Sequence, residues 1–377
     1  MSLTIRSVLK GCKTGRPQTV GVMTIVPLIS ELEDERFDLI SPIEGDLAMT
    51  FPEVKDKDTV SEKDVTRVST TGYGTLRFTN ASGTKTVIIP AQSAYLTKLG
   101  AQDHTMMKAG IVMPNKERAY NDASCIQSTQ PGLIPAGRHH MVVLPMALRE
   151  EAIKLKNKPE FGKFWPPLGA FLQSMGALQQ DRYGRGGVAH LDHFISHFDK
   201  ELSEFVAEFE IVEGMVGAIV LINGAVVGIE RAPSRRYWAS VWEALIRECY
   251  GSLAIFTAKK IGDKDAKLRT PRIPLDTRNV ECLSDLAKAL QTATQKEESQ
   301  IKDLIRDLLD DDFSVEVDEK AGTCEVLSAK HRQFTGQMVR DGSRVVYASL
   351  VLTKEWPRYA DSAKRDKKWK KAEEFSL

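Results

Sequence analysis

Two apolar runs that flank an Asn-Gly pair constrain the fold of this chain more than any other stretch. The runs are residues 216–222 and 225–230, and the pair between them is Asn223-Gly224. Asn-Gly favours a two-residue type I′ turn, because both turn positions need a positive φ. Both runs are apolar at successive positions, so both faces of the hairpin must be covered. The sequence therefore predicts a β-hairpin in the middle of a sheet.

A long amphipathic helix is predicted directly after this hairpin, from about Ser234 to Lys260. Pro and Ser before its first turn, and Lys and Gly at its end, are typical of helix boundaries. At ~1.5 Å per residue it is ~40 Å long and can cross a whole sheet. Gly251 inside it marks a weak point or a place of close packing. The apolar stripe comprises Trp238, Val241, Trp242, Leu245, Cys249, Leu253 and Phe256.

Strands are predicted towards both ends of the chain, and helices in its middle. The strands are expected at 19–28, 133–145, 313–317, 323–327, 333–339 and 344–353, and a second hairpin at 74–79 and 84–89. Helices are expected at 146–158, 161–178 and 190–209, and one or two more at 282–309. The expected fold class is therefore α+β. It combines mixed or antiparallel sheets built from hairpins, a helical middle segment and one long helix packed on the sheet.

The composition divides the chain into three parts. Residues 1–145 are β-rich, and residues 146–357 form an α+β part with the central hairpin and the long helix. We expect these two parts to belong to one unit. Residues 358–377 are Lys-rich and are expected to be a solvated tail.

The bulk composition excludes several classes of protein. Of the 377 residues, 42% are hydrophobic and 27% are charged, which is typical of soluble globular proteins. A formal net charge of +1 gives no overall field for binding nucleic acid. The longest apolar runs are far shorter than the ~18–20 residues of a membrane span. We therefore expect neither a membrane nor a nucleic-acid partner.

The cysteines and the N-terminus predict a cytoplasmic location. The five cysteines are odd in number and widely spread, and no Cys-x-x-Cys occurs. This pattern fits a reducing compartment rather than a disulfide framework. The N-terminus lacks the charged and apolar regions of a signal peptide. These features identify no cofactor and no oligomeric state.

Three histidines, His190, His193 and His197, share one side of the helix predicted at 190–209. His193 and His197 have the i, i+4 spacing of a metal-binding pair. The Glu of a metalloprotease motif is missing between them, because residues 194–196 are Phe-Ile-Ser. Each histidine also directly precedes a core position. The sequence therefore favours boundary residues of the apolar stripe over a metal site.

A second candidate site lies on turns between strands of the N-terminal part, where functional residues often cluster. Gln102, Asp103 and His104 form one turn, and Cys125 and Gln127 follow the next strands. Asp103 and His104 are candidates for ligand binding or general acid–base work. Cys125 is a candidate nucleophile, although a small buried hydrophobic role is the more usual one for a strand cysteine.

Arginines at two further places are candidates for binding an anion. Arg182 and Arg185 lie in a Gly-rich loop between predicted helices. The backbone N–H groups of such a loop and the two guanidinium groups would together bind a phosphate. The start of the long helix is the other place, because helix N-termini attract anions. The residues there are Glu230, Arg231, Arg235 and Arg236. The alternatives are an ordinary loop and surface ion pairs.

Three segments, in order, resemble one family. Residues 100–104, 111–114 and 123–126 resemble its Gly-Ala-Lys-Gln-Asn-Arg run, its Val-Pro strand and its Ser-Cys-Val-Glu run. Residues 217–228 and the helix after them are similar to its Gly-Phe-x-x-Ala-Ile-Asn-Gly-x-x-x-Gly segment, and residues 336–348 resemble its closing Asp-Gly hairpin. Over about residues 15–353 the chain thus resembles the ARG-and-rhodanese-phosphatase-superfamily-associated protein domain, a domain of unknown function.

This resemblance implies a context rather than a reaction. The family is named for its association with ADP-ribosylglycohydrolases and rhodanese/phosphatase-like proteins, which implies work near ADP-ribose, NAD-derived or phosphorylated metabolites in conflict or repair systems. The chain also departs from the family. Gln102-Asp103-His104-Thr105 stands in place of Lys-Gln-Asn-Arg, Gln127 in place of Glu, and Tyr347 in place of His. These departures imply that an activity carried by those positions is altered or lost here.

Three functions remain open at this point. The first is the binding of a nucleotide-derived small molecule such as ADP-ribose at the polar turns and the helix start. The second is hydrolysis of such a ligand, by general acid–base work or through a metal on the histidine face. The third is a structural or protein-interaction module. The sequence feature that would support it is the Trp238/Trp242 face of the long helix, if that face is exposed.

Overall fold

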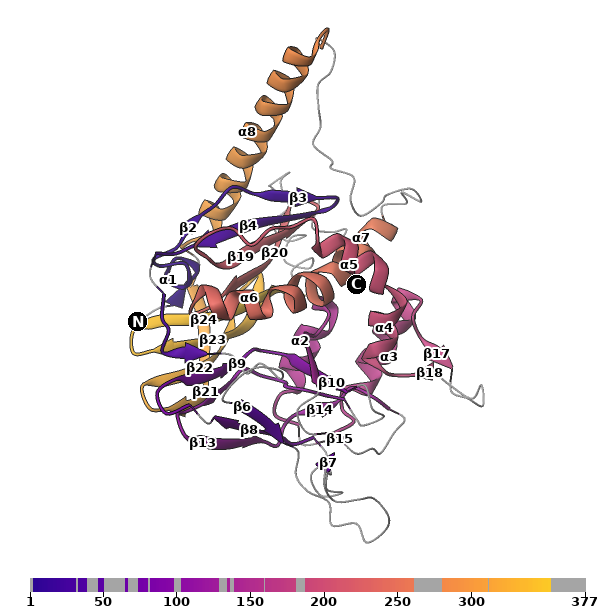
Figure 1. Ribbon diagram of the computed structural model, residues 1–377, viewed down its shortest axis with the longest axis vertical. Helices are drawn as coiled ribbons and strands as arrows, with labels where there is room; N and C mark the ends of the chain where they lie inside the picture. Colours follow the sequence, from indigo (N-terminus) through magenta and orange to yellow (C-terminus); the bar gives the residue numbers. More distant parts are fainter. Residues whose placement is uncertain are drawn as a thin grey trace.

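The computed structural model describes most of the chain and confirms the α+β class (Figure 1). A large antiparallel sheet lies on one side, and several helices gather on the other. The described residues are 3–31, 33–38, 47–50, 65–66, 74–80, 82–97, 103–128, 134–135, 139–158, 160–180, 187–260, 280–310 and 312–353. Gln102, Arg182, Arg185 and the tail at 358–377 lie outside them.

The large sheet joins the two ends of the described chain to its middle. Its strands, in spatial order, are β1 (Leu3–Thr4), β21 (Asp312–Ala321), β22 (Cys324–Lys330), β23 (Phe334–Asp341), β24 (Arg344–Leu352), β20 (Ala225–Arg231), β19 (Met215–Ile222), β4 (Met23–Ile29) and β2 (Lys13–Thr14), with β3 (Gln18–Val20) also paired to β4. The C-terminal strands predicted from periodicity are all present.

The predicted central hairpin is confirmed as β19 and β20. Asn223 has φ 49° and Gly224 has φ 82°, so both turn residues adopt the positive φ that a type I′ turn needs. β20 pairs with β24 on its other edge, and β19 pairs with β4. Alternate residues of β19 point to opposite faces of the sheet. Val220 packs in a cluster with Trp238, and Leu221 in a separate cluster with Ile305.

The long helix is present but changes geometry in its middle. It consists of α6 (Arg235–Glu243), a π-helical stretch η1 (Ala244–Tyr250) and α7 (Gly251–Lys260). The prediction of one uniform α-helix was wrong over those seven residues, which are all buried. The wider π turn lets the neighbours Cys249 and Tyr250 contact one buried ion pair, Arg149–Glu230. Gly251 is a point of close packing, because a Cβ there would press on Leu202.

Gly228 in β20 provides a test of the packing between this helix and the sheet. A Cβ at Gly228 would collide with the phenol of Tyr250, which is fully buried and donates to Glu230. We therefore expect Gly228→Ala to lower the free energy of unfolding by about 1–3 kcal/mol in urea denaturation, the usual cost of overpacking a core. Gly83→Ala is the control, because the nearest atom to its added Cβ is 3.7 Å away. Equal stability of both variants would contradict this packing.

The second predicted hairpin, at 74–79 and 84–89, was wrong. β8 (Leu76–Asn80) pairs with β13 (Lys116–Tyr120) and β6 (Leu47–Thr50), whereas β9 (Thr86–Ile89) pairs with β12 (Gly110–Val112) and β5 (Phe37–Asp38). The Asn80 side chain redirects the chain between them. Its amide donates to the carbonyls of Lys85 at 2.7 Å and Val112 at 3.0 Å, and its oxygen accepts from the Ser82 N–H. The two strands therefore diverge into separate ladders.

The remaining elements are short strands and most of the helices. The strands are β7 (Val65–Thr66), β10 (Ser93–Thr97), β11 (His104–Thr105), β14 (Ser124–Cys125), β15 (Ile134–Pro135), β16 (His139–Val143), β17 (Gln179–Gln180) and β18 (Gly187–Val188). The helices are α1 (Ile5–Val8), α2 (Met146–Leu155), α3 (Trp165–Met175), α4 (Leu191–His197), α5 (Asp199–Val206) and α8 (Leu283–Leu308). The single helix predicted at 190–209 is thus two helices, interrupted at Phe198, whose φ of −113° and ψ of 15° are not helical.

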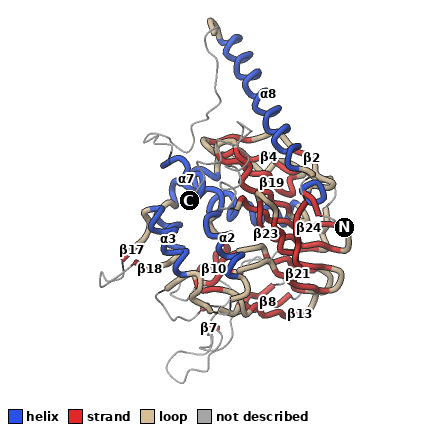
Figure 2. Tube along the Cα trace, turned by 180° about the vertical axis from the view of Figure 1, so that it is seen from behind, coloured by secondary structure: helices blue, strands red, loops and turns tan. Residues whose placement is uncertain are grey.

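Helix α8 projects from the body, as Figures 1 and 2 both show. Only its C-terminal turns carry buried side chains, which are Ile301, Ile305 and Leu308. In the described part of the chain, no helix combines the length and the apolar character needed to cross a membrane. Trp238 and Trp242 are both buried in the core. An interaction surface built on these two tryptophans is therefore not available in this fold.

Candidate functional site

Three distant segments form a short β-like ladder that holds the polar residues predicted from the sequence. His104 and Thr105 pair with Cys125 and Ser124, and the Ile126 N–H donates to the Asp103 carbonyl at 2.9 Å. The next residues then pair with the segment before α4, through a bridge between Gln127 and His190. This ladder brings together side chains from two candidate sites that looked unrelated in the sequence.

Asp103 and His190 form the centre of this cluster. The Asp103 Oδ2 lies 2.8 Å from the His190 Nε2, across 87 residues of chain. The Asp103 side chain is 1% exposed and the His190 side chain 17%. Since an ionised carboxylate only accepts hydrogen bonds, the hydrogen of this contact is carried by Nε2 of His190. A buried carboxylate thus fixes the orientation of an imidazole that solvent can reach.

Gln127 completes the cluster. Its Oε1 accepts from the Asp103 backbone N–H at 3.3 Å, and its side chain is buried. The family motif that this chain resembles has a Gln at the position of Asp103 and a Glu at the position of Gln127. The contact here joins the Gln127 side chain to the Asp103 backbone N–H, while the Asp103 carboxylate pairs with His190.

The other two histidines of the predicted face have different environments. The ring of His193 lies 5.1 Å from that of His190, and burial, followed by the neighbouring His190, lowers the pKa of His193. Its Nδ1 is buried without a hydrogen-bond partner among the described residues. His197 instead packs against Phe198. Among the described residues, no three His, Cys, Asp or Glu side chains are grouped closely enough to hold a metal ion.

Cys125 and His104 lie deeper than the pair. Both are fully buried. The Cys125 Sγ donates to the Gln127 carbonyl at 2.9 Å, and burial raises the pKa of this thiol to about 11. Because the thiolate is the nucleophilic form, a protonated and buried Cys125 suits packing rather than catalysis. Asp103 is paired with His190, so the acid–base partner of this carboxylate comes from another segment than its sequence neighbour His104.

Glu230, at the end of the central hairpin, belongs to a separate buried network. Its carboxylate pairs with the Arg149 guanidinium at 2.8 Å and accepts from the Tyr250 hydroxyl at 2.7 Å and from Ser349. Arg149 is completely buried. Its Nε donates to Gln92 at 3.3 Å. The hydrogen-bond partners of the ion pair are therefore protein groups in the core.

A polar chain continues from this ion pair across the interior. Gln92 donates to Gln337 at 3.4 Å, and Gln337 donates to Asp318 at 2.9 Å. Asp318 in turn accepts from Lys156. Sequence reasoning missed all these residues, because the partner of each one lies far away in the chain and no local pattern indicates it. Arg149 of the ion pair is the residue that could have been noticed, because it is the first charged residue in a helix that covers the sheet.

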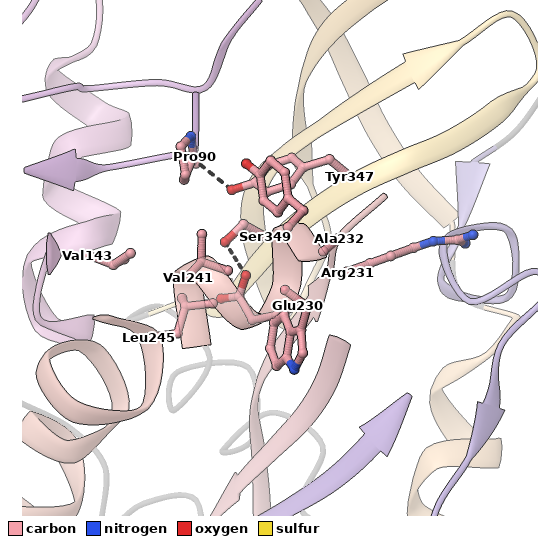
Figure 3. A pocket seen from close by; sticks show the side chains of 12 residues that line it. Pro90, Val143, Glu230, Arg231, Ala232, Val241, Leu245, Tyr347 and Ser349 are labelled. Carbon is pink, nitrogen blue, oxygen red and sulfur yellow. Dashed lines mark hydrogen bonds between the residues drawn. The ribbon is translucent and has the colours of Figure 1, made fainter. Parts of the chain in front are cut away.

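The residues of the predicted anion site at the helix start do not converge on one point, because each of them contacts a different protein group. Figure 3 shows Glu230, Tyr347 and Ser349 around a cavity of about 10 Å³, which is room for about one water molecule. The Arg231 guanidinium points away from it and donates to the carbonyl of Val8. Arg235 pairs with Glu33 on the surface.

The first turn of α6 is likewise occupied by a protein group. The Ser234 side chain caps the helix by accepting from the Tyr237 N–H. Binding of a small molecule at Glu230, Arg231 and Arg235 stays a prediction, and it would need these contacts to rearrange.

Comparison with known proteins gives one finding. A model of the ARG and Rhodanese-Phosphatase-superfamily-associated Protein domain matches residues 11–351. No curated protein and no solved structure matches the chain. The matched region includes the central hairpin, the ladder with Asp103 and His190, and the C-terminal strands. The chain therefore belongs to the ARG and Rhodanese-Phosphatase-superfamily-associated Protein domain family.

Proposed function

We propose that this protein binds a nucleotide-derived small molecule of the ADP-ribose or NAD class at the Asp103–Gln127–His190 cluster. The observation that carries the proposal is the 2.8 Å pair between a buried carboxylate and a solvent-reachable imidazole. Carboxylates in dinucleotide sites accept hydrogen bonds from ribose hydroxyls. The association of the family with ADP-ribosylglycohydrolases supports this ligand class and a role in conflict or repair.

The test compares ligand binding by variants of the cluster. ADP-ribose and NAD are titrated by calorimetry into the full-length wild-type protein and into His190→Ala and Asp103→Asn. We expect both variants to bind at least about tenfold more weakly, a loss of about 1.4 kcal/mol. Asp192→Asn is the matched control, because Asp192 is an exposed carboxylate on α4.

Two results would overturn this proposal. One is the absence of any heat or thermal shift with millimolar ligand and wild-type protein. The other is equal binding by the wild type and His190→Ala. Thermal denaturation without ligand separates loss of the site from loss of the fold, since Asp103 is buried.

Hydrolysis of the same ligand is a second candidate function, and the orientation of the imidazole favours it. With Nε2 held by Asp103, the lone pair on Nδ1 suits a general base that takes a proton from water. Removing such a base typically costs a factor of about 10²–10⁴ in rate. Turnover of ADP-ribose, followed by chromatography, should fall by that factor in His190→Ala. A rate unchanged by the substitution would rule out this role.

A further inference from the structure

A cleft of about 840 Å³ lies between the first described residues and the last turns of α8. One wall is α1 with the residues after it, and the other is the packed end of α8. This volume is within the ~300–1,000 Å³ range of small-molecule sites. Figures 1 and 2 show that the N-terminus and the base of α8 lie on the side of the molecule opposite to α3 and α4. The cleft is therefore separate from the Asp103–His190 cluster.

Positive side chains face the cleft from both walls. Arg6 and Lys10 line it from the N-terminal wall, and Lys302 and Arg306 from α8. Lys302 and Arg306 are four residues apart, so they project from the same side of the helix. Among the described residues that line the cleft, none is acidic. The lining thus combines two guanidinium and two ammonium groups.

These charges are only partly neutralised. Arg6 pairs with Asp310 at 2.8 Å, and Arg306 pairs with Asp303, with both pairs largely exposed. Within the described ranges, neither Lys10 nor Lys302 has a carboxylate at ion-pair distance. Exposed pairs of this kind are weak, because solvent and salt screen them. A phosphate oxygen can therefore replace the carboxylates at small cost.

The rest of the lining suits a small molecule rather than a polymer. Leu9, Ile305 and Leu309 supply apolar surface between the charges. The side-chain oxygens of Thr4 and Ser7 already cap α1. The cations therefore provide the polar contacts. Since the whole chain carries a formal net charge of only +1, no wide positive field extends from the cleft to hold a nucleic-acid backbone.

We propose that this cleft binds a small molecule that carries a diphosphate group. Two adjacent phosphates need cations on two sides, which the facing walls supply. Guanidinium groups hold phosphate oxygens through paired hydrogen bonds, and ammonium groups act as point charges. This site does not depend on the function proposed for Asp103 and His190.

Inorganic pyrophosphate is the probe for the first test. It is titrated by calorimetry into the full-length wild-type protein, Lys302→Glu and Lys10→Glu. We expect each charge reversal to weaken binding at least about tenfold, and binding by the wild type to weaken as salt increases. Lys288→Glu is the control, because Lys288 is exposed on the projecting part of α8 and does not line the cleft. Equal affinity of the wild type and Lys302→Glu, or no binding by the wild type, would overturn the inference.

Thiol alkylation provides an independent readout in the wild-type protein. Cys12 lines the cleft, whereas Cys282 is exposed at the N-terminal end of α8. Mass spectrometry follows the alkylation of both residues with and without pyrophosphate. We expect pyrophosphate to slow the reaction of Cys12 several-fold and to leave that of Cys282 unchanged. Equal rates at Cys12 with and without pyrophosphate would contradict binding in the cleft.

The same variants separate this inference from the proposed function. We expect His190→Ala to bind pyrophosphate like the wild type. ADP-ribose binding that is lost in Lys302→Glu and kept in His190→Ala would overturn the placement of that ligand at Asp103–His190, while supporting the cleft. The reverse pattern, together with unchanged pyrophosphate binding by Lys302→Glu, would support the first proposal and overturn this one.

Discussion

Replacing Arg149 by methionine is expected to lower the free energy of unfolding by about 3–5 kcal/mol, the usual cost of breaking a buried ion pair. Arg149 and Glu230 are 2.8 Å apart, and their side chains are 0% and 3% exposed. Methionine fills part of the volume but leaves the Glu230 carboxylate in the core with only hydroxyl donors, from Tyr250 and Ser349. The destabilisation therefore comes mainly from an uncompensated buried charge.

Urea denaturation at neutral pH measures this loss. Arg6→Met is the matched control, because its ion pair with Asp310 is exposed on both sides and we expect almost no change in stability. The double variant Arg149→Met/Glu230→Gln should recover part of the stability, since it removes both charges. A single variant as stable as the wild type would show that the pair is not buried as described.

Glu248 is expected to make the stability of the protein fall as the pH rises from about 4.5 to about 7. Burial raises the pKa of Glu248 from 4.5 to about 7, and this outweighs the opposing effect of Arg247 beside it. Its Oε2 is buried without a hydrogen-bond partner among the described residues. Between these two pH values the folded state holds the proton more tightly than the unfolded state. This contribution to stability is complete below pH 4.5 and is lost as the pH passes through about 7.

Comparison of the wild type with Glu248→Gln isolates this effect from the other carboxyl groups. The variant should be more stable than the wild type at pH 8, by on the order of 2–3 kcal/mol, because it has no buried carboxylate to ionise. At pH 4.5 the difference should nearly vanish. Glu243→Gln, an exposed carboxyl on the preceding turn, should show no such pH dependence. A stability difference that is the same at both pH values would contradict a raised pKa of Glu248.

Two conformational details show where local sequence information was sufficient and where it was not. The Asn223-Gly224 turn was predictable because the positive φ of both residues is a property of the residues themselves. The π-helical stretch at 244–250 was not. The apolar stripe of the helix continues through it, and the extra residue in the turn is stabilised by contacts of Cys249 and Tyr250 with an ion pair from elsewhere in the chain.

The candidate site likewise has features that the local sequence predicts and features that it does not. Asp103, Gln127 and His190 could each be identified from the sequence as polar residues beside apolar ones. Their meeting could not, because Asp103 and His190 are 87 residues apart and nothing in either segment specifies the other. Arg149 was missed, since its charge is unremarkable in a helix until the fold places it opposite Glu230.

The sequence by itself determined the α+β class, the central hairpin, the C-terminal strands and the family, because φ preferences, periodicity and capping act over a few residues. Only the tertiary structure decided that β8 and β9 separate, that Asp103 orients His190, and that Arg6 and Lys302 face each other across a cleft. In each of these cases, the segments involved are distant in the chain. Such pairings depend on the burial and packing of the whole domain, which no local pattern specifies.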